Sequence, residues 1–361
     1  MQLHSSNNLV IAAAGSRKTQ HIIDLALASP TERVLITTFT VNNLVQIRSR
    51  IVEKHGFLPE NVTLLGWYSF LIQHMIRPYQ AEFLGINFVR GLDFHGVPSR
   101  YAKGLARYVN NSRQVYAKHL AGLASQINES VAGASVTRIQ NIFDHILIDE
   151  VQDMAGHDLT MLNLLFESDL RTTLVGDPRQ VTYHTTNEPK YSQYRDGAIV
   201  DWFRAVQKRG FLEIEERNVS YRCRQEICDE ADKLYAEFNA TVSANAISTG
   251  HDGVFAVHPD HVDHYILQYS PKVLRWDSST PTASVNAINM GDSKGSTEDR
   301  VLIYPTKTME KYFDSQASMA NITRAKLYVA MTRGRFSVAF ATPSKSGLGF
   351  SQWTPRTQFP L

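Results

Sequence analysis

A short apolar run that ends in acidic residues is the first chemically suggestive feature of the sequence. Residues 145–148, HILI, are followed directly by Asp149 and Glu150. Adjacent carboxylates at the end of a strand suit a phosphate-bound Mg²⁺, with Asp149 in the metal shell and Glu150 free to orient or deprotonate a water. An ordinary strand that ends in a solvated acidic turn explains the same residues equally well at this point.

A second segment has the layout of a phosphate-binding loop. Residues 13–19, AAGSRKT, stand between an apolar run and a segment with helical spacing. In a P-loop, backbone N–H groups and the helix N-terminus bind phosphates, Lys18 would reach the β- and γ-phosphates, and the Thr19 hydroxyl would bind Mg²⁺. The strict GxxxxGK[ST] pattern fails at Ala12 and Arg17, so a plain strand-turn-helix is the alternative.

Both segments need strands that end at the same edge of a sheet. Apolar runs predict strands at 9–12, 33–37, 62–65, 145–148, 172–175 and 301–304, with helical patterns between most of them. This alternation predicts an α/β fold whose parallel sheet binds ligands at its carboxyl edge. We expect a first domain at 1–198, a second domain at 199–343 and a loosely ordered tail at 344–361.

Residues 75–142, approximately, differ in character because they are helix-rich and basic. They predict a small helical insertion in the first domain, with either a phosphate-facing side or a merely solvated surface. The histidines between 258 and 264 lack the spacing of a zinc motif, so we do not expect a metal there.

Composition excludes some classes of protein. The chain has 361 residues, 43% hydrophobic and 20% charged, which is ordinary for a two-domain globular protein. The net charge of +2 permits a nucleic-acid partner without arguing for one. Two cysteines form neither a disulfide framework nor a four-ligand zinc site, and no segment reaches transmembrane length, so we expect a reduced, cytoplasmic protein.

The order of the motifs resembles that of UvrD/Rep-type superfamily 1 helicases over nearly the whole chain. Residues 149–153, DEVQD, fit the D-E-x-Q-D pattern of that branch. The other similar segments are the loop at 12–19, TFT at 38–40, YSF at 68–70, Gly176-Asp177 with Gln180 and Tyr183, Tyr221-Arg222, SKG at 293–295 and VAMTR at 329–333. The resemblance implies two RecA-like P-loop domains with parallel sheets flanked by helices.

The resemblance also implies a role for each matching residue. The nucleotide-binding set is Gly15, Ser16, Arg17, Lys18, Thr19 and Tyr221, the last stacked on the base of ATP. Thr19 and Asp149 would hold Mg²⁺, and the catalytic set is Glu150, which activates water, with Gln180, Arg222 and Arg333 at the γ-phosphate. The DNA-contacting set is Thr38, Phe39, Trp67, Tyr68, Tyr183 and Lys294.

Several features depart from the family pattern, among them the following three. Arg17 replaces the glycine before the P-loop lysine, where its Cβ would strain the backbone or its charge would join the phosphate site. Thr297 stands where the SKG motif usually continues to glutamate. Only about 70 residues separate Arg222 from Asp292, so the large insertion of full-length members is missing.

The function implied by the resemblance is an ATP-dependent translocase or helicase of 3′-to-5′ polarity, acting on single-stranded DNA or DNA junctions and hydrolysing ATP between the two domains. The alternative is a nucleotide- or DNA-sensing UvrD-like subunit of a larger complex, for example with a nuclease in phage defence, in which hydrolysis is weak or regulatory. An RNA helicase of the same superfamily is less favoured because D-E-x-Q-D indicates the DNA branch.

Overall fold

The computed structural model describes residues 7–85, 88–183, 185–186, 188–283, 286–343 and 350–355. Its contacts divide the chain into two compact units, which are described separately. The first unit comprises Met1–Ile11, Lys18–Pro178 and Tyr183–Glu216, and the second comprises Ala12–Arg17, Arg179–Thr182 and Arg217–Leu361. Two short pieces of the N-terminal half, at 12–17 and 179–182, therefore belong by their contacts to the second unit.

A six-stranded sheet forms the centre of the first unit. Its strands are β1 (Asn8–Ala12), β2 (Val34–Thr38), β3 (Val62–Gly66), β6 (His145–Ile148), β7 (Arg171–Gly176) and β8 (Glu213–Arg217), in the order β3-β2-β6-β7-β1-β8. The pairs among β3, β2, β6, β7 and β1 are parallel. The five predicted strands of this sheet are confirmed. Because β6 and β7 lie between β2 and β1, the carboxyl ends of β1, β6 and β7 are neighbours.

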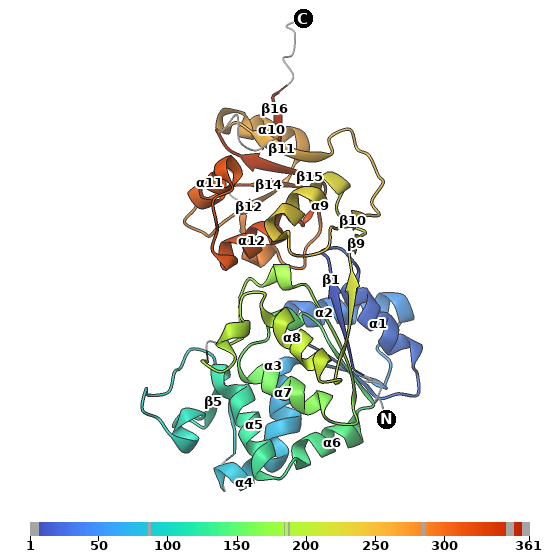
Figure 1. Cartoon of the computed structure of the whole chain (residues 1–361), viewed down its shortest axis with the longest axis vertical. Coiled ribbons are helices and arrows are strands. Elements are labelled where there is room, and N and C mark those ends of the chain that lie inside the picture. Colours follow the sequence, from blue (N-terminus) through green and yellow to red (C-terminus); the bar gives the residue numbers. More distant parts are fainter. Residues whose placement is uncertain are drawn as a thin grey trace, which may run out of the picture. The chain divides into compact units, whose positions relative to one another are not determined.

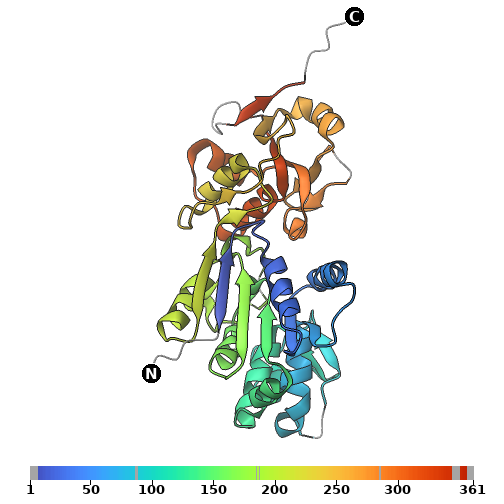
Figure 2. The same ribbon diagram turned by 90° about the vertical axis from the view of Figure 1, so that its right-hand side faces the viewer.

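Helices pack on both sides of this sheet (Figure 2). They are α1 (Lys18–Ala28), α2 (Val41–His55), α7 (His157–Phe166) and α8 (Ile199–Lys208). The helical pattern predicted between the strands at 33–37 and 62–65 is confirmed by α2, which begins where the Thr40 hydroxyl accepts a hydrogen bond from the Asn43 N–H at 3.1 Å. All five residues of β2 are buried, as expected of a central parallel strand that is covered on both faces.

The insertion of the first unit contains the predicted helices and one feature that was not predicted. Its helices include α4 (Gln80–Leu84), α5 (Leu120–Ser130) and α6 (Ala134–Ile142). Between α4 and α5, the strands β4 (Gly91–Asp93) and β5 (Gln114–Tyr116) pair in parallel. Three residues are too few for an alternating pattern to predict a strand, so this pair was missed.

A second six-stranded sheet forms the centre of the second unit (Figure 1). Its strands are β11 (Gly253–Val257), β12 (Lys272–Arg275), β13 (Ile288–Asn289), β14 (Glu298–Ile303), β15 (Gly334–Ala341) and β16 (Ser351–Trp353), in the order β13-β12-β14-β15-β11-β16. All neighbouring pairs are parallel. Two parallel sheets flanked by helices confirm the predicted α/β fold class. Of the predicted tail at 344–361, residues 344–349 and 356–361 lie outside the described residues, and β16 pairs with β11.

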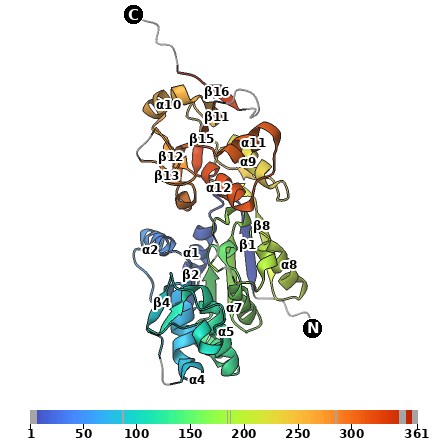
Figure 3. The ribbon, with the colours of Figure 1, turned by 90° about the vertical axis from the view of Figure 1, so that its left-hand side faces the viewer.

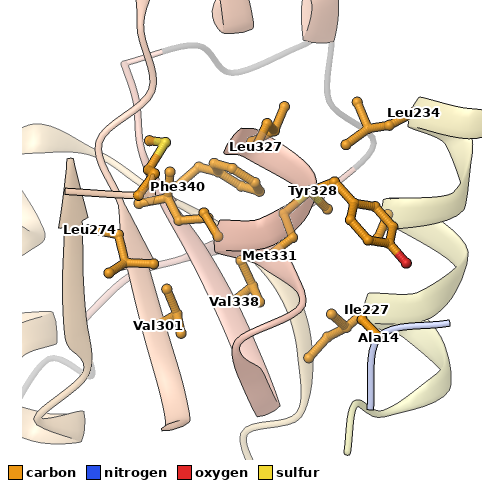
Figure 4. Packing of buried hydrophobic residues seen from close by; sticks show 14 of the residues in the cluster. Ala14, Ile227, Leu234, Leu274, Val301, Leu327, Tyr328, Met331, Val338 and Phe340 are labelled. Atoms are coloured by element: carbon orange, nitrogen blue, oxygen red, sulfur yellow. The ribbon is translucent and has the colours of Figure 1, made fainter. Parts of the chain in front are cut away.

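The core of the second unit follows the alternation of its strands. The helices are α9 (Gln225–Asp232), α10 (Val262–Tyr269), α11 (Lys307–Ser315) and α12 (Asn321–Met331). Val301 and Phe340 point to the face that α9, α11 and α12 cover (Figure 4). Leu302 and Ala339 belong to a second cluster, which includes residues of α10. In Figure 3, α10 lies on the other side of this sheet from α9 and α11. Side chains along a strand alternate between faces, so each strand contributes to two hydrophobic clusters.

Two further observations concern membrane-spanning helices and the state of the cysteines. No helix of the described chain combines the length and the apolar character that a membrane crossing requires. Cys223 and Cys228 are both free thiols, and both are buried.

His145, the first residue of β6, makes stability depend on pH. Its Nε2 and Nδ1 atoms lie 2.9 Å from Thr173 Oγ1 and 3.0 Å from Arg171 Nη2. Burial, and then the charge of Arg171, lowers the pKa of His145 to about 3. In the unfolded chain the pKa is about 6.5, so between these values only the unfolded chain takes up the proton. Stability therefore falls as the pH falls through this window, by about 1.4 kcal/mol per pH unit.

We expect His145→Gln to flatten this part of the pH profile. The measurement is the free energy of unfolding by urea at several values from about pH 7 to about pH 4. His55→Gln is the matched control, because His55 is an exposed histidine on α2. If wild type and His145→Gln lost stability with the same slope, a buried neutral His145 would be ruled out.

Candidate nucleotide and nucleic-acid site

The acidic turn after β6 has an unusual backbone and a fixed hydrogen-bond pattern. Glu150 has a φ of 58°, in the left-handed region that residues other than glycine seldom adopt. Its N–H donates to Asp149 Oδ1 at 2.9 Å. The Gln152 amide donates to the Glu150 carboxylate, and Gln152 Oε1 accepts from the Asp177 N–H at 3.1 Å. Gln152 therefore links the carboxylate of Glu150 to the turn that follows β7.

Gly176 is required for this link. A Cβ at position 176 would lie 2.6 Å from Gln152 Oε1 and 2.9 Å from Val151 Cγ1. Any side chain there would push Gln152 away from both of its partners. The glycine of the segment Gly176-Asp177 thus serves to keep Gln152 against the end of β7.

Thr19, in the first turn of α1, contacts Asp149, the residue that follows β6. The Thr19 hydroxyl donates to Asp149 Oδ2 at 2.8 Å. Asp149 is buried, and its burial, followed by repulsion from Glu150, raises its pKa to about 6, while Lys18 and Thr19 act in the opposite direction. Lys18 forms no ion pair with any described residue. A hydroxyl and a carboxylate in contact are oxygen ligands of the kind Mg²⁺ prefers, so these residues fit that ion together with a phosphate.

The loop at 13–17 is packed against the segment at 217–222, within the second unit. Gly15 has a φ of 80°, and a Cβ there would lie 2.6 Å from Ser220 Oγ and 2.7 Å from Arg222 Cβ. The Tyr221 N–H donates to the Gly15 carbonyl at 3.0 Å. The buried Ser16 hydroxyl has no hydrogen-bond partner among the described residues. An unpaired buried hydroxyl is costly, so the loop fits a phosphate that would supply its partner.

Arg17 adopts a left-handed backbone conformation, which the glycine of the family pattern would adopt without strain. Its φ is 62°, in the left-handed region. Its guanidinium lies 4.1 Å from the ring centroid of Tyr221, a cation–π contact that offsets part of the backbone strain. The Tyr221 side chain remains 48% exposed, so the ring keeps open surface beside Arg17.

Gln180 and Arg333 meet in the second unit. Arg333 is only 2% exposed, and its Nη2 atom donates to Gln180 Oε1 at 3.2 Å. Its other donors bind the carbonyls of Val329 at 2.9 Å and Ser296 at 3.3 Å. Arg222 donates to the carbonyl of Thr332, the residue before Arg333, at 3.0 Å. The two predicted arginines are therefore anchored to the same turn at the end of α12.

Arg179 supports this arrangement, and sequence reasoning missed it. Its buried guanidinium pairs with Asp232 at 3.4 Å and lies 5.0 Å from the ring centroid of Tyr328. These contacts tie the short helix Pro178–Gln180 to α9 and α12 and thereby place Gln180. No pattern around Arg179 distinguishes it from an exposed turn arginine.

The predicted DNA-contacting residues of the first unit differ in exposure. Phe39 and Tyr68 are partly exposed, with ring centroids 6.3 Å apart. Trp67 is 1% exposed, and its indole N–H donates to Asp158 at 2.7 Å. Thr38 is also buried, although in the described part of the chain its hydroxyl has no hydrogen-bond partner. Of these four residues, Phe39 and Tyr68 are thus the two whose rings present surface to a base.

The remaining two DNA candidates are Tyr183 of the first unit and Lys294 of the second. The Tyr183 side chain is 40% exposed, and burial of its hydroxyl and the nearby Asp153 raise its pKa, which keeps the phenol protonated. Lys294 follows the short helix Gly291–Ser293 of the second unit. No group of three or more His, Cys, Asp or Glu side chains suited to a metal occurs in the described part of the chain.

A comparison with protein families supports the resemblance. Residues 97–185 match the model of the UvrD/REP helicase N-terminal domain. The matched segment begins in the insertion and continues through the Asp149–Gln152 turn, β7 and Gln180.

Similar solved structures come from viruses. The chain is similar to the PRRSV helicase at 14% identity and a TM-score of 0.47, over 95% of this chain and 54% of that one. It is similar to arterivirus nonstructural protein 10, a helicase, at 14% identity and a TM-score of 0.49, over 96% of this chain and 62% of that one. A complex of the latter helicase with DNA matches at 14% identity and a TM-score of 0.45, over 96% and 64%. The chain therefore spans less than two thirds of the length of these helicases. No curated protein matches the sequence.

Proposed function

We propose that this chain is an ATP-dependent helicase or translocase that moves on single-stranded DNA with 3′-to-5′ polarity. The observation that carries the proposal is the connected set of Thr19, Asp149, Glu150 and Gln152, in which a P-loop hydroxyl contacts one carboxylate and an amide fixes the next. The UvrD/REP helicase match over residues 97–185 supports the same conclusion.

Each group in the nucleotide site has a distinct chemical task. Lys18 and the unpaired Ser16 hydroxyl bind phosphate oxygens, and Tyr221 stacks on the base. Thr19 and Asp149 would hold Mg²⁺, which when bound neutralises charge on the phosphates. Glu150 accepts the proton of the attacking water, because its carboxylate is held in place by the Gln152 amide. Gln180, Arg222 and Arg333 stabilise charge on the transferring phosphoryl group.

The DNA strand would be held by stacking and phosphate contacts. Phe39 and Tyr68 offer ring faces to successive bases, and such stacking contributes roughly 1–3 kcal/mol per base. Thr38, Tyr183 and Lys294 would contact the sugar-phosphate backbone, which fixes position without reading sequence. We propose the cytoplasm as the location.

The proposal is tested by ATP hydrolysis with and without single-stranded DNA. Wild type is expected to hydrolyse ATP faster when DNA is added. Lys18→Ala is expected to weaken nucleotide binding roughly 10- to 100-fold, because one charged hydrogen bond to phosphate is lost. Lys54→Ala is the control, since Lys54 is an exposed lysine paired with Asp24 at 2.5 Å. DNA-independent hydrolysis that survives Lys18→Ala would show that this loop does not carry the activity.

A second candidate is a DNA- or nucleotide-sensing subunit of a larger complex, with a nuclease as one class of partner. The contacts of Arg333 with two backbone carbonyls and Gln180 favour it, because an arginine held in this way must exchange partners before it can bind a phosphate. Strand displacement decides between the two candidates. Unwinding of a 3′-tailed duplex by the isolated chain, with many turnovers per molecule, would exclude the sensing role.

A further inference from the structure

The insertion of the first unit carries a pocket outside the nucleotide site and the DNA-contacting motifs. It lies beside β4 and β5 and has a volume of about 380 Å³. Leu84, Leu105 and Val109 line it with apolar surface, and Phe88, Asn111 and Arg113 contribute at the same pocket. This volume falls in the range of small-molecule binding pockets, and apolar walls with a few polar groups are typical of them.

The ring of Phe88 is exposed between two arginines. It is 50% exposed, and the guanidinium carbons of Arg113 and Arg90 lie 5.4 Å and 5.9 Å from its centroid. Neither arginine forms an ion pair with a described residue. An exposed aromatic ring next to two uncompensated cations is a surface suited to a flat base with phosphates on either side.

The segment that contributes most of the pocket's lining is strongly positive. Residues 88–116 contain a single acidic residue, Asp93, and the five basic residues Arg90, Arg100, Lys103, Arg107 and Arg113. The Asp93 carboxylate is already occupied, since it accepts hydrogen bonds from the Gly96 N–H at 2.7 Å and the Asn110 amide at 2.9 Å. Of the five cations, Arg107 has a carboxylate partner, Glu188 at 3.8 Å. The segment therefore has an excess of positive charge for an anionic ligand.

Aromatic rings connect this segment with the proposed DNA-contacting motifs. The ring centroid of Tyr68 is 6.3 Å from that of Phe39 and 6.2 Å from that of Phe94. Phe94 is 59% exposed and belongs to the insertion, just after β4. A single strand of DNA that stacks on Phe39 and Tyr68 would thus come into contact with the insertion next.

We propose that the pocket binds one unpaired base of single-stranded DNA, stacked on Phe88, with the flanking phosphates on Arg90 and Arg113. The inference rests on the proposed function, and it adds a second contact point for the strand. Asn111 lines the pocket, and its amide has no hydrogen-bond partner among the described residues, so it is available to the edge of the base. A base can enter such a pocket only when it is not paired, which favours a single strand over a duplex.

The experiment measures binding of a fluorescent oligothymidylate to the full, nucleotide-free chain by anisotropy, from about 50 mM to about 200 mM salt. Arg90→Gln with Arg113→Gln removes only charge, and we expect affinity to fall about tenfold and the salt slope to fall by about 1.4. Phe88→Ala should weaken binding about fivefold or more, whereas Phe88→Leu tests the loss of the ring at similar volume. Arg204→Gln on α8 is the control, since Arg204 is an exposed arginine. An oligonucleotide with iodouracil should crosslink to Phe88.

The outcomes separate this inference from the proposed function. If wild type binds the oligonucleotide and the variants bind it equally well with an unchanged salt slope, the pocket is not a DNA site and the helicase proposal stands. If wild type neither binds single-stranded DNA nor is stimulated by it, both fail. Stronger, Phe88-dependent binding of the matching RNA would overturn the assignment to DNA.

Discussion

Glu150→Gln is expected to lower the turnover of ATP by about 10²- to 10⁴-fold while nucleotide binding is retained. The substitution removes the proposed base for the attacking water, but it keeps an oxygen that can accept the hydrogen bond from the Gln152 amide. It also removes the repulsion that helps to raise the pKa of Asp149, so this proposed metal ligand should ionise more easily. Binding and chemistry are thereby separated in one variant.

The measurement is single-turnover hydrolysis together with the Kd of a fluorescent ATP analogue. Glu129→Gln is the control, since Glu129 is an exposed glutamate at the end of α5. A Glu150→Gln variant that hydrolysed ATP within about threefold of wild type would contradict a base role, since a positioned base contributes far more. Loss of nucleotide binding in this variant would instead assign Glu150 to the phosphate site.

Arg333→Ala is expected to lower turnover by about 10³-fold or more, because an arginine at the transferring phosphoryl group stabilises the charge of the transition state. The same change should lower stability by about 1–3 kcal/mol. The reason is that the carbonyls of Val329 and Ser296 and the amide oxygen of Gln180 lose a buried donor. Arg333→Lys keeps a charge with fewer donors, so it should retain more stability than activity.

Hydrolysis rates and urea unfolding of the same variants separate the two effects. Arg335→Ala is the matched control, because Arg335 lies two residues away and pairs with the exposed Asp299 at 3.0 Å. We expect Arg335→Ala to leave turnover within about twofold of wild type, as for most surface ion pairs. Equal turnover in wild type and a folded Arg333→Ala chain would assign Arg333 a structural role alone, and would favour the sensing function.

The strands of the first sheet were predictable because local patterns determined them. Residues 145–148 and 34–38 are apolar or β-branched, and parallel strands covered on both faces require such runs. β8 was missed because its sequence, EIEER, is charged and largely exposed, so it lacks a buried pattern. The strands within residues 241–285 were missed for a different reason. β11 and β12 are short, and polar loops separate them from their neighbours.

The chemistry of the candidate site was predictable from short spacings along the chain, but its supporting contacts were not. Lys18 and Thr19 follow a strand directly, and Asp149, Glu150 and Gln152 lie within four positions, so covalent connection already limits their separation. Arg179 could not be recognised, because its partners Asp232 and Tyr328 are far away in the sequence. The pocket at Phe88 was likewise missed, since residues from both ends of the segment 84–113 form it.

The sequence by itself determined which chemical groups this protein has and in what order they follow its strands. The tertiary structure alone decided which of these groups meet and which remain exposed. Thr19 contacts Asp149, which is 130 positions away in the sequence. Trp67 is buried and donates to Asp158, 91 positions away, whereas its neighbour Tyr68 remains partly exposed. Burial and pairing depend on contacts between distant segments, and neither residue type nor local spacing contains that information.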